Sequence, residues 1–363
     1  MSKDTTFAIH TKKPTKKDYQ NVVHTAVVLT KRPSLDKLAQ GVIFKPQKEL
    51  YKRAKSKWWT QKIVSPLVYH AKKLGDEKMR KYYQRALFCS HQITQTDKRL
   101  KTQYCNTRVC LICNKIRTAK LINGYVQQLF YKIKPESDTK LSFVTLTLPN
   151  VRQENLTSTI VSITKTLSKI LASLRKTKGL KVNGIRSLEC TITTKKHLIK
   201  RGDVFHPHIH MIVDNGAEEI VSYWLKHNPT ASYKAQKIVH VKNGDLGVLQ
   251  ELFKYATKII GHEKPVIDED TGEIKNVITL KIPELHQIIV ALSGRRRIHA
   301  FGDIRQQNED VYDKLKGQEY DIAPQELMEW QWKTQDWHNI FDDPLTNYIA
   351  PDYIEFKEIS NTS

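Results

Sequence analysis

The segment FHPHIHMIV, residues 205–213, places three histidines at alternate positions: His206, His208 and His210. Alternate side chains of an extended strand point to the same face, so the three imidazoles share one face and the apolar side chains between them share the other. Two neutral imidazoles at positions i and i+2 can bind one cation, which predicts one wall of a metal site. The alternative is a sheet face of solvated or hydrogen-bonded histidines.

The preceding segment GIRSLECTITTKK, residues 184–196, offers a third ligand. Glu189 is the only acidic residue between positions 180 and 200. If this segment is a strand that pairs antiparallel with the histidine strand, Glu189 stands beside His208 and His210. Two imidazoles and one carboxylate leave coordination positions open, as catalytic metal sites do and closed structural sites do not.

A candidate nucleophile follows in GVLQELFKYATKIIGH, residues 247–262, whose apolar residues recur at the i, i+3, i+4 spacing of a core-facing helix. Glu251, Tyr255 and Lys258 form one row along the edge of that stripe. A phenol has an ordinary pKa near 10 and needs a cation or a base to become a nucleophile. Lys258 and the metal would supply the cation, and Glu251 would supply the base. Alternatively, Tyr255 is an amphipathic boundary residue of a surface helix.

Four of the five cysteines cluster, with the spacing C-x15-C-x4-C-x2-C. An odd number of cysteines in a chain without a secretory leader argues against a disulfide framework. Four thiolates would close a structural tetrahedral zinc site, with His91 as a rival for the place of the first cysteine and metal-free thiols as the alternative. Cys190 is expected to face the core and to be inert. The cluster comprises Cys89, Cys105, Cys110 and Cys113.

The charge distribution favours a polyanionic partner. The net charge is +23, and residues 301–363 carry 14 acidic and 5 basic side chains, a net charge of −9, so residues 1–300 carry +32. A body this basic is most simply explained by nucleic acid binding. Cations near the cysteines and in the GRRRIH segment are candidates to hold phosphates, although each one alone can be an ordinary solvated residue. They are Arg108, Lys115, Arg117, Lys120, Arg295, Arg296 and Arg297.

Strand-like segments alternate with helical ones in the middle of the chain, which predicts an α+β fold with an antiparallel central sheet and flanking helices. Basic helices broken near Pro66 and at Gly75 precede it. No run of 18 apolar residues and no leader are present, so a cytoplasmic location and no membrane partner are expected. The predicted strands are 140–150, 184–196, 205–213 and 237–243, and the predicted helices 117–133, 154–179, 217–228 and 247–262.

Three motifs occur in a set order: FVTLTLPN, HPHIHMIV and ELFKYATKI. Over roughly residues 85–302 the chain resembles plasmid rolling-circle replication initiators (Rep) of the HUH endonuclease superfamily, in the branch with one catalytic tyrosine. The resemblance implies an RRM-like palm in which Glu189, His208 and His210 bind Mg²⁺ or Mn²⁺. It implies that Tyr255 is the nucleophile and that Glu251 stands where other branches have a second tyrosine. It also places Thr145, Thr147 and His206 along the site.

The implied activity is nicking of a specific origin strand, which gives a 5′-phosphotyrosyl enzyme and a free 3′-OH primer, followed by rejoining or release. The implied partners are single-stranded or cruciform origin DNA, with a host helicase and DNA polymerase as candidates. Rival functions are an HUH relaxase or transposase, and a non-catalytic zinc-dependent DNA-binding repressor. The predicted parts are a basic helical region 1–84, a Cys-rich zinc-binding segment 85–135, the endonuclease domain 136–302 and an acidic, aromatic-rich tail 303–363.

Overall fold

The computed structural model describes residues 46–96, 99–130, 141–193, 195–241, 251–253, 262–267, 274–305, 327–339, 341–350 and 354–358. Its helices are α3 (Pro46–Lys73), α4 (Glu77–Leu87), α5 (Leu111–Phe130), α6 (Gln153–Lys178), α7 (Lys196–Lys200), α8 (Ala217–His227), η1 (Tyr233–Ala235) and α10 (Ile282–Leu292). Its strands are β1 (Gln92–Thr96), β2 (Arg99–Thr102), β3 (Ser142–Thr147), β4 (Gly184–Ile192), β5 (Phe205–Val213), β6 (Lys237–His240), β7 (His262–Ile267), β8 (Ile274–Leu280), β9 (Ile298–Phe301), β10 (Leu327–Gln331), β11 (Asp336–His338) and β12 (Ile354–Glu358).

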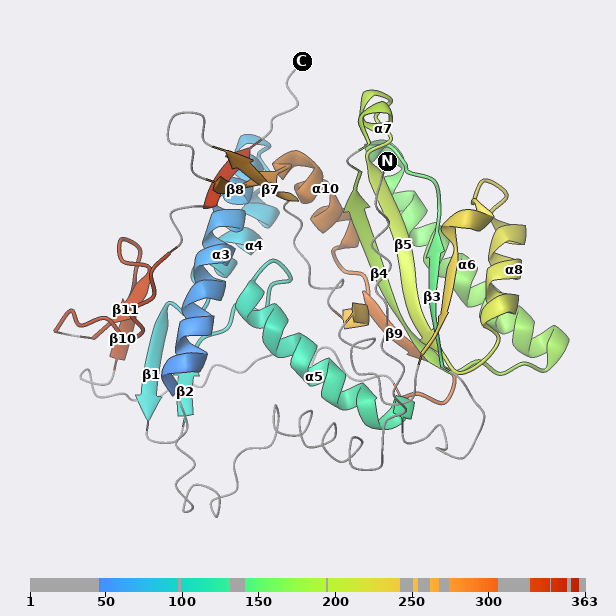
Figure 1. Ribbon diagram of the computed structural model, residues 1–363, viewed down its shortest axis with the longest axis horizontal. Helices are drawn as coiled ribbons and strands as arrows, with labels where there is room; N and C mark the ends of the chain where they lie inside the picture. Colours follow the sequence, from blue (N-terminus) through green and yellow to red (C-terminus); the bar gives the residue numbers. More distant parts are fainter. Residues whose placement is uncertain are drawn as a thin grey trace, which may run out of the picture.

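A five-stranded antiparallel sheet with the order β6-β3-β5-β4-β9 forms the centre of the fold (Figure 1). This is the α+β architecture that the sequence predicts. The histidine strand β5 has the predicted bounds and lies in the middle, between β3 and β4. Apolar residues and histidines alternate along β5, so one face of the sheet is apolar and the other is polar. Phe205, Ile209 and Met211 are buried on the face opposite to the histidines.

Different helices cover the two faces of this sheet. On the apolar face α6, α8 and α10 pack against β3, β4 and β5, and the stripe of α6 that includes Ile160, Ile163 and Leu167 is wholly buried there. Part of the other face is covered by the second half of α5 and by residues 251–253, where Leu121 and Leu252 join a cluster with Ile212. The remainder of that face carries polar side chains.

An N-terminal helical unit stands beside the sheet. α3 continues through Pro66 as one helix, whereas the sequence predicts a break there. Its buried face, which includes Val64 and Leu67, packs against α4 and the cysteine segment, and this packing outweighs the lost hydrogen bond. The predicted break at Gly75 is confirmed, because Gly75 has φ +70° between α3 and α4.

Residues 327–339 and 341–350, which belong to the predicted acidic tail 303–363, pack on this N-terminal unit. β10 pairs antiparallel with β1, in a sheet of order β11-β10-β1-β2. Trp330 and Trp337 are buried against Trp58 of α3 and Ile93 of β1. The burial of these two indole rings stabilises the packing of this segment on the N-terminal unit, even though the segment has a net negative charge.

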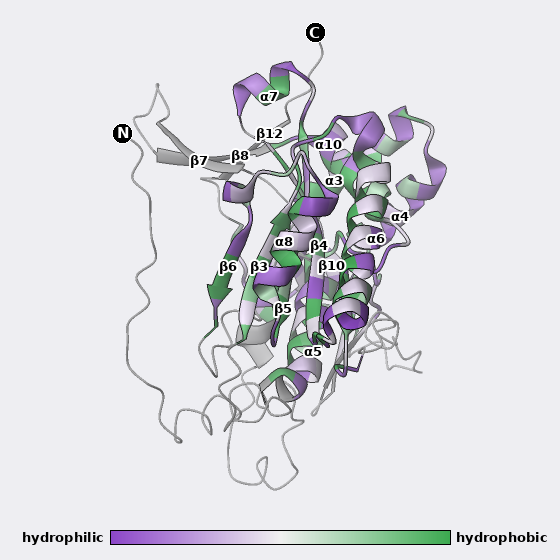
Figure 2. Cartoon of the chain, turned by 90° about the vertical axis from the view of Figure 1, so that its right-hand side faces the viewer, coloured by the Kyte–Doolittle hydropathy of each residue, from purple (hydrophilic) through white to green (hydrophobic). Residues whose placement is uncertain are grey.

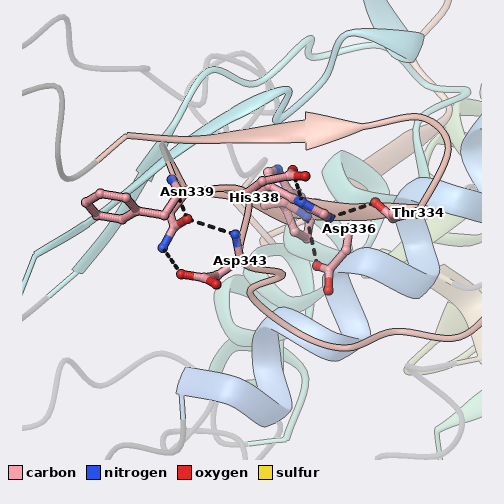
Figure 3. A network of polar contacts seen from close by, with 8 residues as sticks. Thr334, Asp336, His338, Asn339 and Asp343 are labelled. Carbon is pink, nitrogen blue, oxygen red and sulfur yellow. Dashed lines mark hydrogen bonds and ion pairs between the residues drawn. The ribbon is translucent and has the colours of Figure 1, made fainter.

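Polar contacts fix the loop that follows this C-terminal hairpin. Figure 3 shows Thr334 bonded to His338, and Asn339 bonded to Asp343. The buried carboxylate of Asp336 accepts from the backbone N–H and the hydroxyl of Thr346, both at 2.8 Å. A buried carboxylate is tolerated where it is bonded in this way, so the acidic character of the segment is partly structural.

A third sheet, of order β12-β8-β7, pairs residues from the end of the chain with the segment before α10. α10 then connects the two main parts of the molecule. Its Leu285 and Ile289 lie in the core of the N-terminal unit, and Ile288 and Leu292 lie in the core of the central sheet. Among the described residues, none of the helices combines the length and the hydropathy needed to cross a lipid bilayer.

Candidate metal centre on the central sheet

Three side chains from β4 and β5 converge on the polar face of the central sheet. Glu189 lies directly opposite His208 in the antiparallel register. Its Oε2 is 3.4 Å from Nε2 of His208, and its Oε1 is 3.9 Å from Nε2 of His210. One ligand atom from each of the three residues lies within 4.8 Å of the other two. The structure therefore brings together the three residues that the sequence singles out as a ligand set, in a group that could hold a metal ion.

Hydrogen bonds orient both imidazoles. Nδ1 of His208 donates to the backbone carbonyl of His206 at 2.9 Å, which leaves Nε2 with a lone pair in the neutral ring. Nδ1 of His210 lies 3.0 Å from Oγ1 of Thr145, and its ring stacks on Phe143 with centroids 5.4 Å apart. An imidazole lone pair and a carboxylate that face each other suit a shared cation. This donor set fits a divalent ion with open coordination positions.

Burial favours the neutral form of His206 and His210. Desolvation by burial, and then the neighbouring His208, lower the pKa of His210 to about 3. The same two causes lower the pKa of His206 to about 4. Both rings are therefore neutral near pH 7. His206 is outside the group of three, and its Nδ1 donates to Oδ1 of Asn150 at 3.1 Å.

The neighbouring strand β3 places Thr145 opposite His210 and Thr147 opposite His208 in the antiparallel register. The backbone of Thr147 is tied in place by Gln236, whose amide oxygen accepts from Thr147 N at 2.8 Å, and by Trp224, whose Nε1 donates to Thr147 O at 3.2 Å. Sequence reasoning missed Asn150, Gln236 and Trp224 as supporting residues. Only their contacts reveal this role: Asn150 ends the FVTLTLPN motif without being a residue type typical of a metal site, and Trp224 and Gln236 lie outside the three motifs.

The helical row proposed to carry the nucleophile is described in part. Residues 251–253 are helical, and Leu252 and Phe253 pack in a cluster with Ile212, on the same sheet face as the group of three. Phe253 also stacks on Tyr125 of α5, with ring centroids 5.8 Å apart. Tyr255 and Lys258 lie outside the described residues, so their roles stay predictions. Glu251 is within the described helical turn and is partly buried.

The four clustered cysteines form a second group that could hold a metal ion. Their sulfurs lie within 4.8 Å of one another, and Sγ of Cys113 is 3.6 Å from Sγ of both Cys89 and Cys105. Hydrogen bonds from Cys110 and then Cys113 lower the pKa of Cys105, which favours a thiolate. The donor set therefore suits the closed tetrahedral site that zinc prefers.

The structure also decides between the rival first ligands of this cluster. Cys89 is in the group, whereas His91 points Nε2 at Oε1 of Glu329, 3.2 Å away. Cys190 is buried on the apolar face of β4, and burial raises the pKa of its thiol to about 12, as expected for an inert residue. α5 begins beside the cysteines, and its Leu121 and Tyr125 reach the polar face of the central sheet.

The candidate phosphate-binding cations separate into accessible and structural ones. Arg117 is wholly buried and donates to Oδ1 of Asn114 at 2.6 Å and to the carbonyl of Asn106 at 3.3 Å, so its assignment to DNA binding is wrong. Arg295 is partly buried, and its Nε donates to the carbonyl oxygen of Ala291, near the end of α10, at 2.9 Å. Lys115 and Arg296 are exposed, and three are intermediate: Arg108, Lys120 and Arg297.

Fold and site together define a class: an antiparallel α+β domain with an open carboxylate–imidazole site, joined to a four-cysteine unit. Comparison with known proteins finds a family match over this part of the chain. The family model described as "Replication protein" matches residues 97–216, which include the last three clustered cysteines and all three residues of the sheet site. Residues 97–216 are therefore similar to those of replication proteins.

Three curated relatives carry the name "Protein rep". The one from Streptococcus pneumoniae serotype 2 is 25% identical over 173 residues, 43% of this chain and 52% of the relative. The one from Staphylococcus aureus is 28% identical over 127 residues, 35% of this chain and 52% of the relative. The one from Lentilactobacillus hilgardii is 27% identical over 113 residues, 31% of this chain and 33% of the relative. The chain thus spans about half the length or less of these relatives. No solved structure matches the chain.

Proposed function

We propose that the chain is a rolling-circle replication initiator that nicks one strand of its origin DNA through Tyr255. The observation that carries the proposal is the convergence of Glu189, His208 and His210 on one face of the central sheet, with all three ligand atoms within 4.8 Å of one another. The helical turn at residues 251–253 packs on that same face, which supports a nucleophile supplied from the residues that follow it.

Glu189, His208 and His210 would hold a divalent cation, Mg²⁺ or Mn²⁺. Such a cation, when bound, polarises the scissile phosphate and stabilises its developing charge. Tyr255 attacks the phosphorus through its phenol oxygen, and the bond from phosphorus to the 3′ oxygen breaks. Glu251 accepts the phenol proton, and Lys258 favours the phenolate by its charge. The 3′ oxygen takes up a proton, which yields a 3′-OH that can prime synthesis.

Glu251 has a second task at the end of a replication round. A carboxylate four residues before the tyrosine in the sequence can take a proton from water, and that water then releases the 5′-phosphoryl group from Tyr255. Release by water, where a second tyrosine would retain the strand, makes termination differ from initiation. The four cysteines would hold Zn²⁺ and fix the segment from which Arg108, Lys115 and Lys120 reach phosphates.

The test is incubation of the protein with a tiled set of single-stranded oligonucleotides from the replicon that encodes it, with and without Mn²⁺. We expect a covalent adduct on a denaturing gel with one tile only, dependent on Mn²⁺ and absent in Tyr255→Phe. Tyr255→Phe is expected to bind that tile as the wild type does. An adduct formed by Tyr255→Phe refutes the nucleophile, and binding without any adduct favours the zinc-dependent repressor.

A further inference from the structure

The connection between β4 and β5 is strongly basic. It spans residues 193–204 and contains α7, and among its described residues five side chains are exposed. Those of Lys195, Lys196 and Lys200 make no ion pair with any described residue. Figure 2 shows α7 as a largely hydrophilic turn above the strands. The five exposed residues are Lys195, Lys196, His197, Lys200 and Arg201.

This connection begins three residue pairs beyond the Glu189–His208 pair. In the antiparallel register Glu189 faces His208, Thr191 faces His206, and the last pair is Ile192 with Phe205. α7 stands at that end of β4 and β5 (Figure 1).

A chain of hydrogen bonds holds the base of α7 in a fixed place relative to the site. Asn150 donates through Nδ2 to the carbonyl of Asp203 at 3.2 Å and accepts from Nδ1 of His206 at 3.1 Å. The carbonyl of His206 in turn accepts from Nδ1 of His208 at 2.9 Å. The basic connection is therefore anchored through His206 to a metal-ligating residue.

Two ion pairs reinforce the same base. Asp203 Oδ2 lies 3.2 Å from Arg201 Nε, and Asp203 Oδ1 lies 3.7 Å from Arg152 Nε. One carboxylate thus faces two guanidinium groups, which leaves the local charge positive. Both arginine side chains remain largely exposed and can face a further anion.

We propose that the α7 connection is a phosphate-binding element, in which Lys195, Lys196 and Lys200 hold the backbone of single-stranded DNA next to the nucleotide at the Glu189–His208–His210 site. The proposal rests on the proposed function. Ammonium groups position a strand through its phosphates without reading sequence, and such contacts make affinity depend on salt. The element would hold the strand in register so that one phosphodiester faces the nucleophile.

The test compares Lys195→Ala/Lys196→Ala/Lys200→Ala with a matched control, Lys165→Ala/Lys169→Ala/Lys176→Ala. The control removes the same charge from exposed positions on α6, which packs on the opposite face of the sheet. Both triple variants are made in the Tyr255→Phe background. Affinity for a fluorescent single-stranded oligonucleotide is measured without added Mg²⁺ or Mn²⁺ between about 0.1 and 1 M salt, so that nicking plays no part and the cysteine site keeps its zinc.

We expect the slope of log affinity against log salt to be shallower in the α7 variant by about 2, since each lost phosphate contact removes about 0.7. That change corresponds to about 100-fold weaker binding at 0.1 M salt if the proteins bind equally at 1 M. The control should keep the wild-type slope. A triple Lys→Arg variant at the α7 positions should keep it as well, because guanidinium groups also bind phosphate.

Equal slopes in the α7 variant and the wild type would overturn the proposal, and so would equal losses in the α7 and α6 variants. Loss of slope in the Lys→Arg variant would also overturn it. Failure of the proposed function is distinguishable, because it would appear as absence of the covalent adduct in the wild type while the difference in salt slope persists. All six substituted lysines are exposed, and thermal melting verifies that each variant is folded.

Discussion

Glu189 Oε2 lies 3.4 Å from His208 Nε2, on side chains that face each other across β4 and β5 and are both buried. Glu189→Gln keeps the shape of this pair and removes the charge that a cation needs. We expect the affinity for Mn²⁺, measured by isothermal titration calorimetry, to fall by more than about tenfold, since even outer partners of metal ligands contribute that much. Glu154→Gln on the exposed start of α6 is the control. Unchanged Mn²⁺ affinity in Glu189→Gln would remove this residue from the ligand set.

The cysteine cluster makes a prediction about metal content. Purified protein is expected to contain about one zinc ion per chain by atomic absorption, as a closed tetrahedral site requires. Cys113→Ser should lose this zinc, because Sγ of Cys113 lies 3.6 Å from two other sulfurs. Cys190→Ala is the matched control, since Cys190 lies in the core of the central sheet. Full zinc content in Cys113→Ser, or its loss in Cys190→Ala, would contradict the assignment.

The C-terminal hairpin should stabilise the N-terminal unit. Trp330 and Trp337 are buried with ring centroids 4.6 Å apart, and Trp337 Nε1 donates to Ser90 O at 2.9 Å. Trp337→Ala is expected to lower the free energy of unfolding in urea by about 3–5 kcal/mol. Trp332→Ala, in the same hairpin but 42% exposed, should change it by less than about 1 kcal/mol. Similar effects of the two substitutions would mean that the hairpin is not part of the core.

A buried histidine of α10, His286, which contacts Tyr83 of α4, makes stability depend on pH. Burial, and then the neighbouring His70, lower the pKa of His286, and the hydroxyl of Tyr83 lies 2.9 Å from its Nδ1. The unfolded chain protonates this group at a higher pH than the folded chain. Its contribution to stability is therefore present above the unfolded pKa of about 6.5 and is lost as the pH falls toward the folded pKa.

His286→Gln should accordingly flatten the fall in unfolding free energy between about pH 7 and pH 5. Urea denaturation at a series of pH values measures this slope. His227→Gln provides the control, because that side chain is exposed at the end of α8. A slope in His286→Gln that equals the wild-type slope would show that His286 does not contribute to the pH dependence.

The central sheet could be predicted from sequence because its signals are local. The alternation in FHPHIHMIV fixed which side chains share a face, and the antiparallel pairing that brings Glu189 opposite His208 follows from a short connection. The helix stripe of α6 and its end at Gly179, where φ is +62°, were equally visible. Each of these features depends on residues within one element or on its immediate neighbour.

What could not be predicted depends on partners far along the chain. Arg117 reads as a surface cation, and only the packing around Asn114 makes it a buried hydrogen-bond donor. Pro66 predicts a break in the helix, but tertiary contacts stabilise α3 as one continuous helix through this residue. The pairing of β1 with β10 has no local signal at all. Nor does the supporting contact of Gln236 with Thr147, which joins residues on separate elements.

Translation order gives the β1–β10 pairing a consequence for how the protein is made. Residues 97–326 lie between the two strands, and Trp330 N donates to the carbonyl of His91, beside the first clustered cysteine. A ribosome therefore exposes the outer edge of β1 long before its partner has been synthesised, and an open strand edge invites wrong pairing. Copies that terminate before residue 327 keep that edge open, so only a chain that has been synthesised past β10 closes the unit that carries the cysteines.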